Sequence, residues 1–262
     1  MLSHPNINPI AFSFSYIKVY WYGILYLVGF VSAWLISLKR CQQVYNSPIS
    51  KSQVPDLIFY ASIGVVVGGR LGYLLFYDLE NFIFQPWLIF KVWNGGIHGM
   101  SFHGGLMGLM LTVGLFSQKN KCNISDVFDF IAPMAPIGLG LGRLGNFING
   151  ELWGRVTDLP IGMIFPSGGP LPRYPSQLLE TILEGPFLWV ILWSSLRRKR
   201  VRLFISAKFI LWYGVFRFIA EIFRQPDFQI GYFCFNTITI GQIFSVPMIV
   251  IGLSILKYIS RS

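Results

Sequence analysis

The amino-acid sequence predicts an all-α integral membrane protein with seven transmembrane helices, an outer N-terminus and an inner C-terminus. Three observations predict this fold class. Only 12% of the 262 residues are charged and 53% are hydrophobic, whereas a soluble domain carries about 25% charged residues. Long apolar runs recur along the chain, and basic residues concentrate in alternate connections between them. We therefore expect lipid to surround most of the fold.

The apolar runs set the expected number of helices, because a spanning helix needs about 20 mostly apolar residues. Seven runs lie at 19–38, 57–77, 104–116, 127–148, 177–196, 207–223 and 238–257. The third run is short for a span unless the approach at 99–105 is also helical, so a re-entrant segment is the alternative. The other connections are mostly short, which predicts a single membrane domain over 1–262.

Basic residues predict the orientation, since Lys and Arg are enriched in cytoplasmic loops. With the N-terminus outside, thirteen of the 21 Lys and Arg fall in inner connections or at the inner ends of runs, five in outer connections and three deeper within runs. The net charge of +10 is thus spread among apolar runs, which favours membrane orientation over nucleic-acid binding. Arg70, Arg143 and Arg217 lie within runs, where a charge usually faces a partner, a cavity or a ligand.

The connection at 149–175 differs from the others in composition. It is rich in Gly and Pro, which favours turns over a long helix. We expect this segment to form a small ordered head on the outer, periplasmic face of the membrane domain.

Cysteine and glycine patterns predict no metal and no nucleotide cofactor. Cys41 and Cys122 fall on the inner side and Cys234 on the outer side, without metal-ligand spacing. Residues 140–145 match the pattern GxGxxG. A dinucleotide site places this pattern between a strand and a helix, and no strand precedes it here. The glycines are better explained by close packing of membrane helices.

Polar residues from four runs converge on the outer end of the predicted bundle. Polar residues that serve only helix packing should show no preference for one side, whereas a site for a lipid head group in the outer leaflet would show one. The convergence therefore predicts a functional site at the outer end. Its members are Arg70, His98, His103, Arg143, Asn146, Glu151, Arg155, Arg217 and Glu221.

Two arginines favour a phosphate ligand. Tyr213, Arg217 and Glu221 are spaced i, i+4 and i+8, so they share one helix face. Arg217 and Glu221 could simply neutralise each other, which is the structural alternative. The guanidinium fork, however, matches the geometry of phosphate, and Arg143 is expected at a similar depth. We therefore favour a phosphate clamp made by Arg143 and Arg217.

The fifth run carries two acids that are expected to serve these arginines. Glu180 and Glu184 are four residues apart, so they lie on one helix face, and Pro186 predicts a kink beside them. We interpret both acids as structural partners of the arginines.

Two histidines, His98 and His103, are bracketed by glycines. Imidazoles ordinarily titrate near pH 6.5, which suits proton transfer at neutral pH. For either histidine alone, a hydrogen-bonded interfacial side chain is the structural alternative. Neighbouring glycines allow a ligand to approach closely, and the setting of His103 at the start of the third run favours it as the functional residue.

The string Gly142–Gly154 reads Gly-Arg-Leu-Gly-Asn-Phe-Ile-Asn-Gly-Glu-Leu-Trp-Gly, and His103-Gly104-Gly105 stands before it. In these elements, and over nearly its whole length, the chain resembles the bacterial prolipoprotein diacylglyceryl transferases. The resemblance implies a multi-pass enzyme of the cytoplasmic membrane without a cofactor. Such enzymes move the diacylglyceryl group of phosphatidylglycerol onto the lipobox cysteine of a preprolipoprotein, which leaves a thioether and glycerol 1-phosphate. This is the first step of lipoprotein maturation.

The resemblance also implies which positions matter. We expect His103 to act as the base, with Glu151 as the second candidate, while Arg143 and Arg217 stabilise the departing phosphate. The expected catalytic residues are His103, Arg143, Arg217, Glu151 and Tyr26. The expected substrate-binding residues are Arg143, Asn146, Gly154, Tyr213, Glu221 and Arg70.

Two other classes of function remain open from the residues alone. A transporter or lipid flippase with outer arginines should carry ionisable residues on toward the inner side, and the inner halves of the runs hold few. A head-group receptor without catalysis would need the same binding residues. Product formation by the purified protein separates the three classes.

Overall fold

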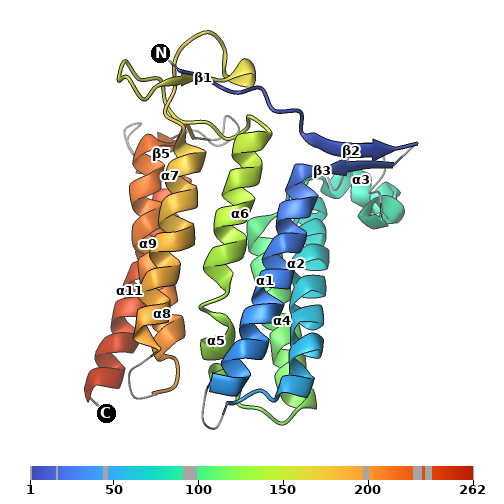
Figure 1. Ribbon diagram of the computed structural model, residues 1–262, viewed down its shortest axis with the longest axis vertical. Coiled ribbons are helices and arrows are strands. Elements are labelled where there is room, and N and C mark those ends of the chain that lie inside the picture. Colours follow the sequence, from blue (N-terminus) through green and yellow to red (C-terminus); the bar gives the residue numbers. More distant parts are fainter. Residues whose placement is uncertain are drawn as a thin grey trace.

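The computed structural model describes residues 2–15, 17–43, 47–90, 99–196, 201–226, 232–233 and 238–261. Long helices run side by side along one axis, and short strands gather at one end (Figure 1). The first described residues lie at this end, and the last helix finishes at the other (Figure 1). The chain therefore begins and ends at opposite ends of the bundle.

Every predicted run contains helix. The single helices are α1 (Trp21–Gln43), α2 (Val54–Tyr77), α4 (Phe102–Lys119), α9 (Phe204–Phe223) and α11 (Ile240–Arg261). The fourth run divides into α5 (Ile124–Ile131) and α6 (Ala135–Ile148), and the fifth into α7 (Ser176–Ile182), η4 (Leu183–Phe187) and α8 (Leu188–Ser195). The uncertain third run is one unbroken helix of 18 residues, α4, which includes the last part of its glycine-rich approach.

Four helices are long and apolar enough to cross a membrane, and a fifth is added if the pair α5 and α6, bent by 48°, counts as one span. They are 21–42, 51–77, 176–195 and 240–261. Helix α9 is not among them, because Lys208, Arg217 and Glu221 interrupt its apolar length. Composition therefore identifies fewer spans in the described residues than the seven expected, although a helix occupies each run.

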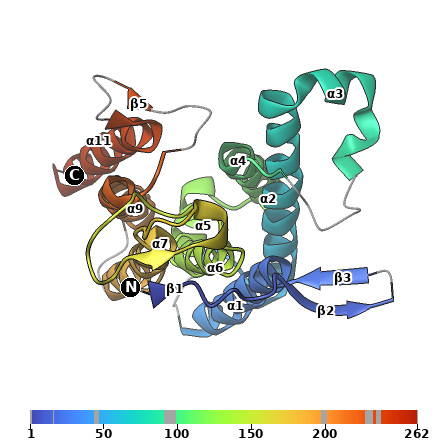
Figure 2. The same ribbon diagram turned by 90° about the horizontal axis from the view of Figure 1, so that it is seen from above.

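The strands form two-stranded pairs that the all-α prediction did not include. Strand β1 (Leu2–Ser3) pairs in parallel with β4 (Met163–Ile164), β2 (Ile10–Phe14) pairs with β3 (Ile17–Tyr20), and β5 (Tyr232–Phe233) pairs with β6 (Ile238–Thr239). Beyond the end of α2 lie α3 (Leu79–Phe84) and the short helix η2 (Pro86–Phe90). Figure 2 shows that α3 and the β2–β3 hairpin project sideways from the bundle.

The connection at 149–175 folds as a compact segment at the strand end (Figure 1). It contains β4 and the turn η3 (Pro166–Gly168), and Arg173 ties it together: its guanidinium lies 4.0 Å from the Trp153 ring centroid and donates to the Gly168 oxygen at 2.9 Å. Phe165 is fully buried within it. The composition of this segment thus produces an ordered head rather than another long helix.

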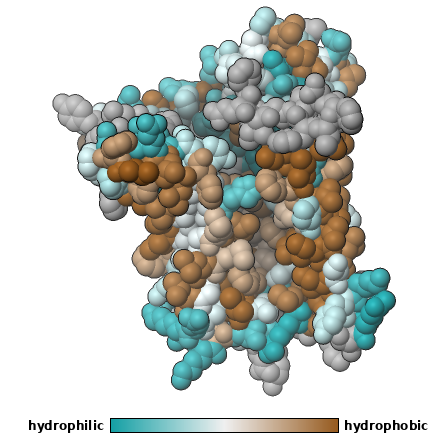
Figure 3. Space-filling view, turned by 180° about the vertical axis from the view of Figure 1, so that it is seen from behind, coloured by the Kyte–Doolittle hydropathy of each residue, from teal (hydrophilic) through white to brown (hydrophobic). Residues whose placement is uncertain are grey.

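The helices form an open horseshoe. Contacts run from α4 to α2, to α1, to α6, to α7, to α9 and to α11, and Figure 2 shows a gap between α4 and α11. Figure 3 shows that the surface is hollowed between these two arms, with hydrophobic residues over the middle of the bundle and hydrophilic ones toward its ends. This distribution of residues is the one that a bilayer around the helices favours.

Glycines allow the closest helix contact, which joins α2 to α4. Gly64, Gly68 and Gly72 recur every four residues on α2, and they face Gly104 and Gly108 of α4. A methyl group on Gly72 would lie 2.6 Å from the Cα of Gly104. The two backbones therefore touch directly, as small residues permit in membrane helices, and this contact fixes the helix that carries His103.

A methyl group at Gly108 should destabilise this contact. It would lie 2.9 Å from the carbonyl carbon of Gly64 and 3.0 Å from the Cα of Gly68, and overpacking of this kind costs about 1–3 kcal/mol. We expect Gly108→Ala to lower the midpoint of thermal unfolding in detergent. Gly23→Ala is the matched control, because no described atom lies within 4 Å of its added methyl. Equal midpoints for the two variants would contradict the packing.

Candidate active site

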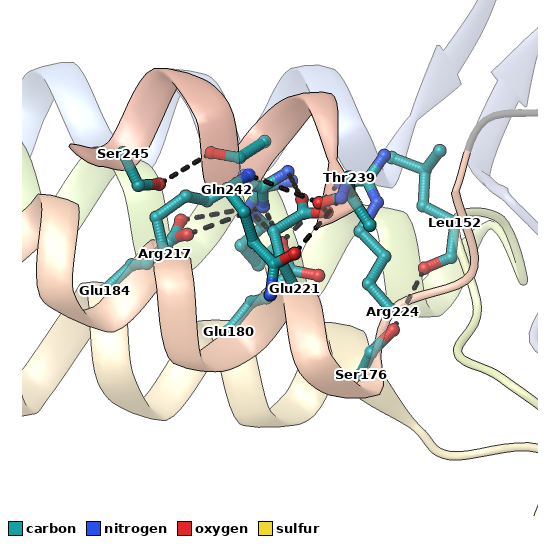
Figure 4. A network of polar contacts seen from close by, with 12 residues as sticks. Leu152, Ser176, Glu180, Glu184, Arg217, Glu221, Arg224, Thr239, Gln242 and Ser245 are labelled. Atoms are coloured by element: carbon teal, nitrogen blue, oxygen red, sulfur yellow. Dashed lines mark hydrogen bonds and ion pairs between the residues drawn. The ribbon is translucent and has the colours of Figure 1, made fainter. Parts of the chain in front are cut away.

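A cluster of arginines and glutamates lies among α6, α7, η4 and α9 (Figure 4). Arg143 of α6 places its Nε 3.0 Å from an oxygen of Glu180 and 3.0 Å from an oxygen of Glu184. The spacing of four residues brings both acids to the same helix face, as the sequence predicts. Their interpretation as partners of the arginines is confirmed.

Arg217 of α9 binds the same acids from the other side. Its Nη1 lies 2.7 Å from Glu180 Oε2 and 3.7 Å from Glu184 Oε1, while its Nη2 pairs with Glu221 one turn further along α9. Arg224 completes the cluster with its Nη1 3.8 Å from Glu180 Oε2. The ion pair between Arg217 and Glu221, which was the structural alternative, is therefore present, and it is part of a larger network.

Burial explains why the charges are arranged in this way. Glu180 and Glu184 are 1% and 0% exposed, whereas the side chains of Arg143 and Arg217 are 17% and 16% exposed. An unpaired charge is very costly away from water, and the three acids balance three arginines. The glutamates thus form the buried floor of the site, and the side chains of Arg143 and Arg217 lie closer to its surface.

The guanidinium groups of Arg143 and Arg217 differ in which nitrogens contact the carboxylates. Both terminal nitrogens of Arg217 contact carboxylates. The hydrogen bond that Arg143 donates within the described part of the chain comes from Nε. Its Nη1 and Nη2 donate no hydrogen bond to any described residue, so the fork that matches a phosphate is available on Arg143. The predicted clamp is therefore asymmetric.

The face of α9 that carries Arg217 is turned toward the interior of the horseshoe. Tyr213 lies one turn before Arg217 and is 4% exposed, and its ring stacks with that of Phe102 on α4 at 6.2 Å between centroids. His103, the next residue of α4, packs its ring against Phe244 of α11 at 5.1 Å. These aromatic contacts bridge the gap between the two arms near the start of α4.

His103 itself lies on the surface of this gap. It is exposed, and Ser101 caps the start of its helix by accepting a hydrogen bond from Gly104 N at 3.3 Å. His103 makes no hydrogen bond with the described residues, so the structure does not join it to the arginine cluster directly. His98, the alternative, lies outside the described residues.

Asn146 and Glu151 form the rim of the site where α6 ends. The amides of Asn146 and Asn149 both donate to Glu151 Oε1, at 3.0 Å and 3.1 Å. Asn146 is buried, whereas Glu151 is exposed. Gln177, which sequence reasoning missed, donates to the Glu151 carbonyl at 2.6 Å. The rim is thereby tied to α7, which carries the acids.

Close backbone packing around position 154 leaves no room for a side chain larger than that of glycine. The backbone N of Gly154 donates to Tyr174 O at 2.9 Å, and a Cβ would lie 2.6 Å from the carbonyl oxygens of Tyr174 and Phe223. Its backbone also bridges to Arg224. The structure thus gives Gly154 the role of joining the end of the Gly142–Gly154 string to the end of α9.

Tyr26 and Arg70 lie apart from the cluster contacts. The Tyr26 hydroxyl is 3.3 Å from that of Tyr22, whose ring packs against Gly145 of α6. Arg70 is 8% exposed and donates to the carbonyls of Leu88 at 2.8 Å and Gly99 at 3.3 Å. These bonds give Arg70 a structural role, because they hold two segments of the α2–α4 connection.

The N-terminal segment supplies a further contact that the sequence did not reveal. His4 is buried, and its Nε2 lies 2.7 Å from the carbonyl oxygen of Phe147, near the end of α6. The parallel pair β1 and β4 places it there. A two-residue strand that pairs with a partner about 160 residues away leaves no local sequence signal.

Comparison with known proteins identifies the family of this chain. The family model for prolipoprotein diacylglyceryl transferase matches residues 9–258. A protein of Legionella pneumophila (strain Lens) is 51% identical over 253 residues, which cover 97% of each chain. A protein of Coxiella burnetii (strain Dugway 5J108-111) is 52% identical over 252 residues, 96% of this chain and 95% of the relative. Both are named phosphatidylglycerol--prolipoprotein diacylglyceryl transferase.

The match to the family model covers the arginine cluster, the rim and the helix that carries His103. This chain belongs to the prolipoprotein diacylglyceryl transferase family.

Proposed function

We propose that this chain transfers the diacylglyceryl group of phosphatidylglycerol to the lipobox cysteine thiol of a preprolipoprotein. The observation that carries the proposal is Arg143, whose terminal nitrogens are available while its Nε is held on buried acids. A membrane-depth guanidinium arranged in this way suits the phosphate of a lipid head group. The names of the relatives supply the two substrates and the reaction.

At the reacting carbon, the reaction forms a carbon–sulfur bond and breaks a carbon–oxygen bond. The cysteine sulfur attacks the glyceryl carbon that carries the phosphoester, the carbon–oxygen bond breaks, and its electron pair stays on the phosphate oxygen. The products are a thioether and glycerol 1-phosphate. The departing phosphate gains negative charge, and Arg143 is placed to stabilise it with donors that are already oriented. Asn146 and Tyr26 orient the head group or the thiol in this proposal.

His103 accepts the thiol proton in this mechanism. A free cysteine thiol is mostly protonated at neutral pH, and the thiolate is the nucleophile. Both amide donors of the rim already occupy one oxygen of Glu151, while His103 makes no hydrogen bond within the described part of the chain. This difference favours His103 over Glu151 as the base.

The remaining residues of the site support these steps. Tyr213 stacks on Phe102 beside His103, and Glu221 holds one side of Arg217. Gly154 keeps the rim close to α9, and Arg70 steadies the connection that leads to α4. Side chains of this chain carry out every proposed step, so the proposal includes no cofactor, no metal and no nucleic-acid partner.

We place the chain in the bacterial cytoplasmic membrane with seven spans, an outer N-terminus and an inner C-terminus. The opposite positions of the two chain ends support an odd number of spans (Figure 1). The charged residues of α9 are compatible with a span because Arg217 and Glu221 are paired within the cluster. With thirteen basic residues inside and five outside, this orientation turns the site toward the periplasm.

Purified protein supplied with phosphatidylglycerol and a lipobox peptide should release glycerol phosphate and add one diacylglyceryl mass to the peptide. A peptide with Cys→Ser at the lipobox is the control and should remain unmodified, because a hydroxyl is a far weaker nucleophile than a thiolate. Binding or transport of the lipid without a thioether product, or equal product from the serine peptide, would refute the proposed reaction.

Replacing Arg143 with lysine should lower turnover about tenfold to a hundredfold. Lysine keeps the charge but loses the fork, and a hydrogen bond to a charged group contributes about 1.5–3 kcal/mol. Arg217→Lys should also lose activity, since one ammonium cannot pair with Glu180 and Glu221 as the guanidinium does. Turnover with the lipobox peptide measures both effects.

The matched control is Arg202→Lys, because Arg202 forms an exposed pair with Asp126 and lies outside the site. It should keep wild-type turnover. Full activity in both site variants, Arg143→Lys and Arg217→Lys, would contradict the phosphate clamp.

His103→Gln should slow turnover most at neutral pH and recover part of it as the pH approaches about 8.5, where the thiol ionises without help. The ratio of wild-type to variant rate, measured from pH 6.5 to 9, reports this recovery. His4→Gln is the control histidine: it should change stability through the bond to Phe147 but not the pH profile. A ratio for His103→Gln that stays constant with pH would exclude its role as the base.

A further inference from the structure

We infer that Glu184 is a positioning residue that holds Arg143 by its Nε and so directs the terminal nitrogens of Arg143 to the substrate phosphate. This inference rests on the proposed function. It concerns an acid that touches no reacting atom in the proposed mechanism and acts through the arginine.

The contact itself defines the direction of the guanidinium. Glu184 Oε2 accepts a hydrogen bond from Arg143 Nε at 3.0 Å, and Glu184 is 0% exposed. A guanidinium is planar, with its donors in fixed directions. A carboxylate bound at Nε therefore orients the plane of the group and leaves the far edge, with Nη1 and Nη2, for another anion.

The second oxygen of Glu184 is not used by the hydrogen bonds of the cluster. Glu184 Oε1 is buried and accepts no hydrogen bond from any described residue. The Nη1 of Arg217 lies 3.7 Å from this oxygen, too far for a hydrogen bond. A buried carboxylate oxygen without a donor is unfavourable, so a residue chosen for stability would satisfy both oxygens. Such exceptions tend to occur at functional sites.

The backbone fixes Glu184 at this place. It belongs to η4, a π-helical turn that contains Pro186, and turns of this kind are frequent at functional sites. The next residue, Gly185, packs directly on α6: a methyl on Gly140 would lie 3.0 Å from the Gly185 Cα. Glu184 is thus held one residue from the point where its helix touches the helix of Arg143.

Glu180 Oε2 also lies 3.0 Å from Arg143 Nε, but Glu180 is not equivalent to Glu184. Its Oε2 is shared among Arg143, Arg217 and Arg224, so it neutralises the cluster as a whole. Without the charge of Glu184, Arg143 competes with Arg217 for the same oxygen. We expect the guanidinium of Arg143 to turn toward Glu180 and its terminal nitrogens to leave the direction of the substrate.

Glu184→Gln tests the inference. The amide keeps the size of the side chain but removes the charge and turns a donor toward Arg143. We expect kcat with the lipobox peptide to fall at least tenfold, with little change in the KM for phosphatidylglycerol, because orientation matters most when charge develops on the departing phosphate. Glu184→Asp keeps the charge but shortens the reach, so it should retain more activity than Glu184→Gln.

A double-mutant cycle separates positioning from a structural role. If Glu184 acts through Arg143, Glu184→Gln should cost little further activity in an Arg143→Lys background. Asp129→Asn is the control, because Asp129 is a partly buried acid that binds Ser206 at the far end of α9. Its effect should be the same in both backgrounds. If Glu184→Gln does not fold, the same double-mutant cycle is measured with Glu184→Asp in its place.

The outcomes are distinct. Wild-type turnover in Glu184→Gln, or losses from Glu184→Gln and Arg143→Lys that simply multiply, would overturn the positioning inference while the proposed function stands. A wild-type protein that forms no thioether would overturn the proposed function instead. A loss of kcat that is absent from the Arg143→Lys background would support the inference.

Discussion

The permanent charge of arginine within an apolar bundle is the constraint on which the rest of the site depends. A guanidinium cannot escape its burial by losing a proton, so Arg143 and Arg217 require carboxylates nearby. Glu180 and Glu184 meet this requirement from a third helix segment. The resulting network joins three parts of the bundle: α6, the α7–η4 segment and α9. In the proposed reaction, a lipid head group binds at this network.

In the proposed reaction, the same ion pairs that stabilise the arginines also orient one of them for catalysis. Arg217 uses both terminal nitrogens on acids, while Arg143 uses Nε. A donor that is already oriented requires no rearrangement when charge develops in the transition state. The two arginines are therefore not equivalent: Arg217 anchors the network, and Arg143 presents the fork. Near the start of α4, ring contacts of Phe102 with Tyr213 and of His103 with Phe244 connect the two arms beside this site.

Local patterns in the sequence predicted the helices and the identity of the charged partners, because periodicity and spacing are local properties. The pairing of Glu180 and Glu184 with arginines followed from their spacing of four residues. Spacing could not tell which nitrogen each acid binds, nor that Arg70 is used by backbone carbonyls. The pairing of β1 with β4 depends on tertiary structure alone. The recurring glycines of α2 and α4 were a visible signal of the closest helix contact.

An experimental structure of the protein in nanodiscs of phosphatidylglycerol tests the central claim most directly. The account predicts that the lipid phosphate lies about 2.7–2.9 Å from Nη1 and Nη2 of Arg143, while Nε remains on Glu184. A head group bound elsewhere, or an Arg143 whose terminal nitrogens are turned onto Glu180 and Glu184 beside a bound lipid, would contradict it.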